Sequence, residues 1–266
     1  MTFLKKTLAL AGAAALVASF SAAALAQSTL ETIKSRGSIN IGMLVDFAPF
    51  GILDEKGNPD GYDADVARLL AKDLGVEVKL VPVTGPNRIP YLVSNQVDVL
   101  VASLGVTEER AKQVDFSAPY AGIEIFVFGD VNAKVANADD LAKQNIAVAR
   151  ASTQDTAITD IAPETANIQR FDDDSTAVQA LLSGQTNLMG ASNVVISQIE
   201  GVAPGRFDTK FSLKRQSQAI AVRPGDADLL EAINSFLAKA KASGELDALH
   251  EKWVGGPLPT FVSADK

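Results

Sequence analysis

Residues 97–110 read VDVLVASLGVTEER, and this stretch contains both the fold pattern and the most informative polar residues of the chain. Its first part, residues 97–102, is an apolar run of the length of a buried strand. Thr107 suits the N-cap of a following helix, whose first turn presents backbone N–H groups and the positive end of the helix dipole. Arg110 falls in that turn, and its guanidinium fits a carboxylate through two parallel hydrogen bonds. Mixed charges at a helix start are more often simply solvated, so composition alone leaves both roles open.

The segments on either side of this stretch alternate between strand-like apolar runs and runs with helical spacing. We expect strands at residues 39–45, 76–83, 97–102, 123–128, 146–149 and 220–222. We expect helices at residues 62–74, 89–95, 229–242 and 246–253, and two more that begin at the capping residues Ser28 and Ser175. This alternation predicts an α/β protein with two units of mostly parallel sheet flanked by helices, and a cleft between them. Ligands of such sheets bind where strands end and helix N-termini point inward.

Composition excludes several classes of site. The 266 residues include no cysteine and a single histidine, His250. Disulfides, Cys-ligated zinc or iron–sulfur sites and a histidine triad on a metal are therefore impossible, and we expect no metal and no cofactor. A net charge of -8 and a pI near 4.8 argue against nucleic acid as a partner, because such binders need a basic surface.

The N-terminus has the pattern of a secretory signal peptide. Lys5 and Lys6 precede an alanine-rich apolar stretch over residues 7–25, which ends in the small-residue pattern Ala24-Leu25-Ala26. A membrane anchor is the alternative, since a span needs about 20 apolar residues, but this stretch is only weakly hydrophobic. We expect residues 1–26 to be removed and the product to be soluble in the periplasm.

Three further stretches lie at expected strand or helix ends. Phe47 and Phe50 flank a proline in residues 46–50 and would form a rigid apolar wall, although core packing explains either ring equally well. Arg88 lies at a loop-to-helix junction and would either hold an anion or be solvated. Residues 151–154 place two hydroxyls, those of Ser152 and Thr153, at a strand-to-helix junction.

These residues, in this order, resemble the family-3 extracellular solute-binding proteins, the periplasmic amino-acid receptors of ABC importers. The resemblance covers nearly all of the chain after residue 26, and its most specific part is residues 107–120, with Arg110 and the triplet Asp115-Phe116-Ser117. It implies a two-lobed, type II periplasmic-binding-protein fold that closes on its ligand about two hinge strands. Lobe 1 would comprise residues 27–123 and 218–266, and lobe 2 would comprise residues 124–217.

The resemblance also implies roles for individual residues. Arg110 would bind the ligand carboxylate, assisted by the N–H groups of Gly105 and Thr153. The carbonyl of Ser103 and nearby hydroxyls, including that of Ser152, would be polar partners, and Phe47 would stack on the ligand. A monomer that hands its ligand to an inner-membrane permease is expected.

One position departs from the family pattern. Members that bind α-amino acids usually carry an Asp eight residues after the glycine that ends a helix, but here that position is Ser192. A buried ammonium without a carboxylate partner would cost on the order of several kcal/mol. Either another acid substitutes, such as Asp46 or Glu124, or the ligand lacks the ammonium. Arg88 lies in a stretch similar to that of acidic-amino-acid binders, which favours an anionic ligand with at least one carboxylate, such as a dicarboxylate.

Two rival functions differ in partner or chemistry. The resemblance extends to periplasmic cyclohexadienyl dehydratases, but these need a general acid in the cleft, which Ser192 cannot supply. The run Asp172-Asp173-Asp174 is interpreted as a solvated turn and helix start rather than as a calcium site, and His250 as a packing or surface residue. We therefore expect no enzyme. A sensor that passes its ligand to a receptor differs only in partner, and the sequence does not separate the two.

Overall fold

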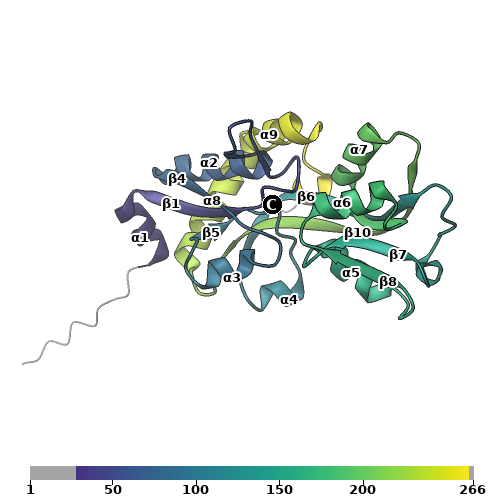
Figure 1. Cartoon of the computed structure of the whole chain (residues 1–266). Coiled ribbons are helices and arrows are strands. Elements are labelled where there is room, and N and C mark those ends of the chain that lie inside the picture. Colours follow the sequence, from purple (N-terminus) through teal and green to yellow (C-terminus); the bar gives the residue numbers. More distant parts are fainter. Residues whose placement is uncertain (1–27, 264–266) are drawn as a thin grey trace, which may run out of the picture.

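The structure is a computed structural model, and it describes residues 28–263. Its centre is an eight-stranded sheet (Figure 1). The strand order across the sheet is β4 (Glu77–Pro82), β1 (Ser38–Met43), β5 (Val99–Leu100), β10 (Phe207–Val222), β6 (Asp115–Asp130), β9 (Leu188–Ser192), β7 (Asn145–Ala149) and β8 (Asn167–Phe171). A separate hairpin pairs β2 (Ile52–Leu53) with β3 (Pro59–Asp60).

Two long antiparallel strands join the two ends of the sheet. β6 and β10 pair from Asp115 with Val222 to Asp130 with Phe207, and they run through the middle of the molecule in Figure 1. On one side, β10 pairs with β5, which belongs to a parallel set with β1 and β4. We call this set and its helices lobe 1. On the other side, β6 pairs with β9, which is followed in the sheet by the parallel strands β7 and β8. We call these strands and their helices lobe 2. The two expected sheets therefore form one continuous eight-stranded sheet that the two lobes share.

Helices cover both lobes. Lobe 1 carries α1 (Thr29–Arg36), α2 (Tyr62–Leu74), α3 (Arg88–Val93), α4 (Glu108–Ala111), α8 (Ala227–Ala242) and α9 (Glu245–Val254). Lobe 2 carries η1 (Ala138–Leu141), α5 (Thr153–Ile161), α6 (Asp174–Ser183) and α7 (Asn193–Val202), and the short α10 (Thr260–Ser263) packs on β6. The chain therefore returns to lobe 1 for its last long helices, because β10 carries it back across the sheet.

Most expected elements are present, and the differences have physical causes. Ser28 and Glu31 form the predicted capping box of α1, and Gly75 ends α2 in the left-handed conformation. The hinge strands β6 and β10 extend beyond the apolar runs at residues 123–128 and 220–222 that predicted them. In the added parts, polar and buried residues alternate, so no apolar run marks those parts as strand. Ser175 does not cap α6: the side chain of Asp173 accepts the Thr176 N–H at 2.7 Å instead. β8, β9 and α7 were not anticipated.

Other expectations concern the chain as a whole. His250 is a packing residue, since its ring lies edge-on to Tyr62 at 5.7 Å in the interior of lobe 1. Within residues 28–263, no helix is long and apolar enough to cross a membrane, and no group of three or more metal-binding side chains occurs. The expected signal peptide, residues 1–26, lies outside the described residues.

Candidate functional site

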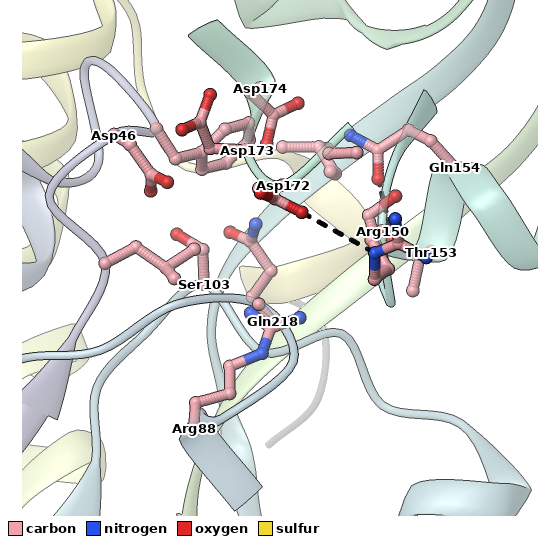
Figure 2. Close-up of a pocket in the computed structure, with 16 residues that line it drawn as sticks. Asp46, Arg88, Ser103, Arg150, Thr153, Gln154, Asp172, Asp173, Asp174 and Gln218 are labelled. Atoms are coloured by element: carbon pink, nitrogen blue, oxygen red, sulfur yellow. Dashed lines mark hydrogen bonds and ion pairs between the residues drawn. The ribbon is translucent and has the colours of Figure 1, made fainter. Parts of the chain in front are cut away.

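A pocket lies between the two lobes, next to the hinge (Figure 2). It measures about 450 Å³ when its open mouth is included. Lobe 1 contributes the segment that follows β1 and the segment that follows β5, together with Arg88 at the start of α3. Lobe 2 contributes the segments that follow β7 and β8, where α5 and α6 begin. Strand ends and helix N-termini of both lobes meet at this pocket, which is the kind of place where the sequence predicted the ligand to bind.

Arg110 is positioned by α4 and bridges the lobes. Thr107 caps this helix as predicted, because its hydroxyl accepts the Arg110 N–H at 3.2 Å. The guanidinium donates through Nη1 to Gly105 O at 2.8 Å and through Nη2 to Ala151 O of lobe 2 at 2.8 Å. Burial, with the nearby Arg88 adding repulsion, lowers its pKa to about 9. The charged fork is thus satisfied only by neutral carbonyls, and a carboxylate would be its stronger partner.

Arg88 reaches the same cleft from α3. It is 5% exposed, and its Nη1 donates to Ala102 O at 2.8 Å. Its Nη2 lies 3.5 Å from Ala151 O, the carbonyl that Arg110 also contacts. Burial lowers the Arg88 pKa to about 10, although several carboxylates partly offset this. The structure therefore brings together the two arginines that the sequence singled out.

Phe47 forms part of the pocket wall. It is 4% exposed and stacks on Phe50 with 5.5 Å between ring centroids. The loop that carries both rings is closed by two hydrogen bonds between Phe47 and Gly51. A Cβ at Gly51 would lie 2.0 Å from Leu44 O, so only glycine fits at that position. Phe47 therefore fits both predicted roles, core packing and pocket wall, because it packs against the core and lines the pocket.

Ser103 was expected to contribute its main-chain carbonyl to the site, and its hydroxyl has a structural role. Its Oγ donates to Asp63 Oδ2 at 2.8 Å, and its N–H donates to the Tyr120 hydroxyl at 3.0 Å. The Tyr120 hydroxyl in turn donates to Asp63 Oδ1 at 2.7 Å. Burial raises the pKa of Asp63 to about 7, although these hydrogen bonds oppose the shift. Ser103 lines the pocket, but its hydroxyl is engaged in this buried network.

The remaining predicted donors lie at the edge where the lobes touch. Gly105 lies opposite Gln218 of β10 in an antiparallel bridge. The hydrogen bonds of this bridge are made by the residues on either side of Gly105, so its own N–H and C=O point away from β10. A Cβ at Gly105 would lie 2.8 Å from Thr153 Cγ2 across the cleft. Thr153 begins α5, where N–H groups lack intrahelical partners. The Ser152 hydroxyl caps the same helix by accepting the Asp155 N–H at 3.0 Å.

Four of the residues considered from the sequence do not line this pocket: Arg110, Gly105, Ser192 and Glu124. Arg110 lines the adjoining groove, which shares Arg88 with the pocket. Ser192 is fully buried at the end of β9, and its hydroxyl accepts the Val195 N–H at 3.4 Å as the N-cap of α7. Its expected place as a ligand contact is thus not what this structure shows, because the hydroxyl is used for capping. Glu124 forms an ion pair with Arg215 at 2.7 Å on the hinge strands.

Sequence reasoning missed the acidic side of the pocket. The run Asp172–Asp174 does not form a purely solvated turn: all three residues line the pocket opposite Asp46 of lobe 1, as Figure 2 shows. Asp172 lies 3.7 Å from Arg150. Burial between the lobes, together with repulsion from Asp46, raises the pKa of Asp174 to about 7. The available signal was the position of this run directly after a strand, at the end where ligands bind.

A second missed residue is Gln218 on the hinge strand β10. Its side chain is 1% exposed and rises into the middle of the pocket in Figure 2. No residue within 28–263 forms a hydrogen bond with either its Oε1 or its Nε2. The sequence gives little indication of a role for this residue, because a glutamine in a strand belongs to no recognisable motif.

Comparison with known proteins identifies the family. Residues 39–256 match the bacterial extracellular solute-binding proteins, family 3. The chain belongs to this family. The matched range begins in β1 and ends just after α9, so it includes both lobes and both hinge strands.

Individual relatives agree in length and fold. The L-cystine-binding protein TcyJ of Escherichia coli K12 is 30% identical over 250 residues, which cover 92% of this chain and 94% of TcyJ. A crystal structure of the P235GK mutant of ArgBP from T. maritima is 33% identical, with a TM-score of 0.78 and coverage of 85% of this chain and 99% of that one. The ancestral amino-acid-binding protein AncCDT-1, a precursor of cyclohexadienyl dehydratase, is 33% identical, with a TM-score of 0.79 and coverage of 85% and 99%. The type II, two-lobed fold is thereby confirmed.

Proposed function

We propose that this chain is the periplasmic solute-binding component of an ABC importer, which binds an amino acid or related carboxylate between its lobes and delivers it to a membrane permease. The observation that carries this proposal is Arg110, a charged fork in the cleft of a family-3 solute-binding fold whose donors reach only main-chain carbonyls of both lobes. The names of the relatives, which bind cystine and arginine, support an amino acid as the ligand class.

The proposed mechanism is binding and closure without chemistry. The ligand carboxylate docks on Arg110 and replaces the Gly105 and Ala151 carbonyls as the partner of its two donors. The first-turn N–H groups of α5, beginning at Thr153, then approach from lobe 2, and Phe47 packs on the ligand. Closure is driven only by the difference in ligand affinity between the open and closed states.

The lobe boundaries belong to the same proposal. Lobe 1 comprises residues 27–123 and 218–266, and lobe 2 comprises residues 124–217, with the crossings in β6 and β10. These crossings are supported by the paired run of β6 and β10, in which register shifts flank Ala219. The protein acts as a periplasmic monomer, exported through cleavage of residues 1–26, and both closed lobes contact the permease.

A ligand panel tests this function. Mature protein from residue 27 is refolded to remove bound solute and melted with amino acids, with the matching acids that lack the α-amino group, and with dicarboxylates. We expect at least one carboxylate to raise the melting temperature, because a ligand at about 100 times its dissociation constant adds roughly 2.7 kcal/mol of stability. Release of phenylpyruvate from prephenate, followed by absorbance, is expected to be absent. No shift with any carboxylate, or turnover of prephenate, would contradict the proposal.

A further inference from the structure

We propose that Asp46, Asp174 and Gln218 form a subsite for the positively charged nitrogen of the ligand, in place of the Asp that this chain lacks at Ser192. The inference rests on the proposed function and narrows it. The ligand is then a carboxylate that also carries an ammonium group, an α-amino acid rather than a dicarboxylate. The arginines hold one end of the ligand, and this subsite holds the other.

Gln218 is the first observation that points to a ligand. Its amide is buried at the hinge, and both of its polar atoms lack a partner among the described residues. Leaving a buried donor and acceptor unsatisfied costs free energy, because each group loses its hydrogen bonds to water without gaining a partner. Its side chain faces the pocket between Ser103 and Arg150 in Figure 2. A ligand ammonium that donates to Oε1 would satisfy the acceptor.

The aspartates are the second observation. Asp46 follows β1 in lobe 1, and Asp174 begins α6 in lobe 2, yet both line one pocket. The Ser175 hydroxyl lies 3.5 Å from Asp46 O, so these two segments touch across the cleft. Neither carboxylate forms an ion pair with any residue in the described part of the chain. Burial raises the pKa of both carboxyl groups; repulsion from Asp173 adds to the shift at Asp46 and repulsion from Asp46 adds to it at Asp174, while Arg88 partly offsets both shifts.

The charge of the pocket decides between the two kinds of ligand. Four aspartates line it, at positions 46, 172, 173 and 174, against two arginines, at positions 88 and 150; Arg110 in the adjoining groove adds a third cation, so one negative charge remains in excess. A dicarboxylate would bring two more negative charges to this lining, whereas an ammonium would neutralise part of the excess. Because Asp46 and Asp174 come from opposite lobes, one cation between them would also hold the lobes together.

Isothermal titration calorimetry on the mature protein tests the subsite. The probes are L-glutamine and L-arginine, their desamino analogues 4-carbamoylbutanoate and 5-guanidinopentanoate, and L-cystine and glutarate. We expect the tightest amino acid of this set to bind at least about 30-fold more tightly than its desamino analogue or glutarate, since an unpaired buried charge costs at least 2 kcal/mol.

Variants separate the subsite from the rest of the cleft. Asp46→Asn, Asp174→Asn and Gln218→Ala are each expected to weaken the tightest amino acid roughly tenfold, as loss of a hydrogen bond to a charged group does. Affinity for desamino analogues is expected to stay within about threefold. Glu124→Gln is the matched control, because it removes a negative charge from the hinge outside the pocket, and it is expected to bind normally. Circular dichroism verifies that each variant folds.

Each contrary result has a distinct meaning. If 4-carbamoylbutanoate or glutarate, neither of which carries a cation, binds as tightly as the amino acids, the subsite is refuted while the carboxylate-binding function stands. If Glu124→Gln lowers amino-acid affinity and the Asp46 and Asp174 variants do not, the ammonium partner is Glu124 and the subsite is again refuted. If no carboxylate binds at all, the proposed function fails and the subsite fails with it.

Discussion

Replacing Arg110 with alanine is expected to weaken carboxylate binding at least about 30-fold, because truncating one partner of a buried, hydrogen-bonded charge pair typically costs 2–5 kcal/mol. The side chain makes no hydrogen bond to a carboxylate in this structure; its donors meet only Gly105 O and Ala151 O. Removing it therefore frees two carbonyls at the cleft edge and leaves the core intact. Calorimetry with the tightest probe measures the affinity, and urea unfolding verifies the fold.

Two matched variants make the Arg110 result specific. Arg110→Lys keeps the charge but lacks the two-pronged donor, so it is expected to bind with intermediate affinity. Lys112→Ala removes an exposed cation at the end of the same helix and is expected to bind like the parent protein. Near-parental affinity in Arg110→Ala would remove Arg110 from the site.

Replacing Asp63 with alanine is expected to have the largest effect on stability. Its fully buried carboxylate accepts hydrogen bonds from Ser103 Oγ and Tyr120 Oη. Alanine would leave both hydroxyls without that partner, at a cost of about 1–3 kcal/mol for each buried group. Because Ser103 lines the pocket, the loss should also loosen the strand end that follows β5. Urea unfolding near pH 4, where the contribution of Asp63 to stability is largest, measures the change in the free energy of unfolding.

Asp63→Asn tests the protonation of the same network. Burial raises the pKa of Asp63 from 3.8 to about 7 in the folded protein. Between these values the folded state retains a proton that the unfolded state loses, so this residue's contribution to stability is present below pH 4 and lost as pH rises towards 7. At 1.36 kcal/mol per pKa unit, the loss is at most about 4 kcal/mol.

Asparagine mimics the protonated form, because its NH₂ can donate to Ser103 Oγ while its oxygen accepts from Tyr120. Asp63→Asn should therefore gain stability relative to the parent protein as pH rises from 4 to 7, and the difference should level off above pH 7. Urea unfolding of both proteins across this range measures it. A difference that is constant with pH, or one that shrinks as pH rises, would contradict the raised pKa.

Local sequence patterns predicted the features that depend on neighbouring residues. The Ser28 and Thr107 caps, the helix that ends at Gly75 and the strand-to-helix junction at Ser152 all follow from interactions within a few residues. Arg110 was singled out by its place in the first turn of the helix that Thr107 caps, but its role as a carboxylate ligand came from the family resemblance and stays a prediction.

The missed features depend on contacts between distant segments. Asp174 and Asp46 are 128 positions apart in sequence, and only the closing of two lobes brings them to one pocket. The hydroxyl of Ser103 could face either the ligand or the core, and Asp63, forty residues earlier, directs it inward. Ser192 caps a helix that the apolar pattern did not predict. Nothing local marks Gln218, whose unpaired amide becomes apparent only once the surrounding chain is in place.

A crystal structure of the mature protein with its tightest-binding amino acid tests the central claim most directly. The account predicts both Arg110 Nη atoms within hydrogen-bond distance of the ligand carboxylate, with the Ala151 carbonyl released from Arg110. It also predicts the ligand ammonium between Asp46 and Asp174, with Gln218 Oε1 as a third partner. A ligand carboxylate held elsewhere, while Arg110 keeps its bonds to Gly105 and Ala151, would contradict it.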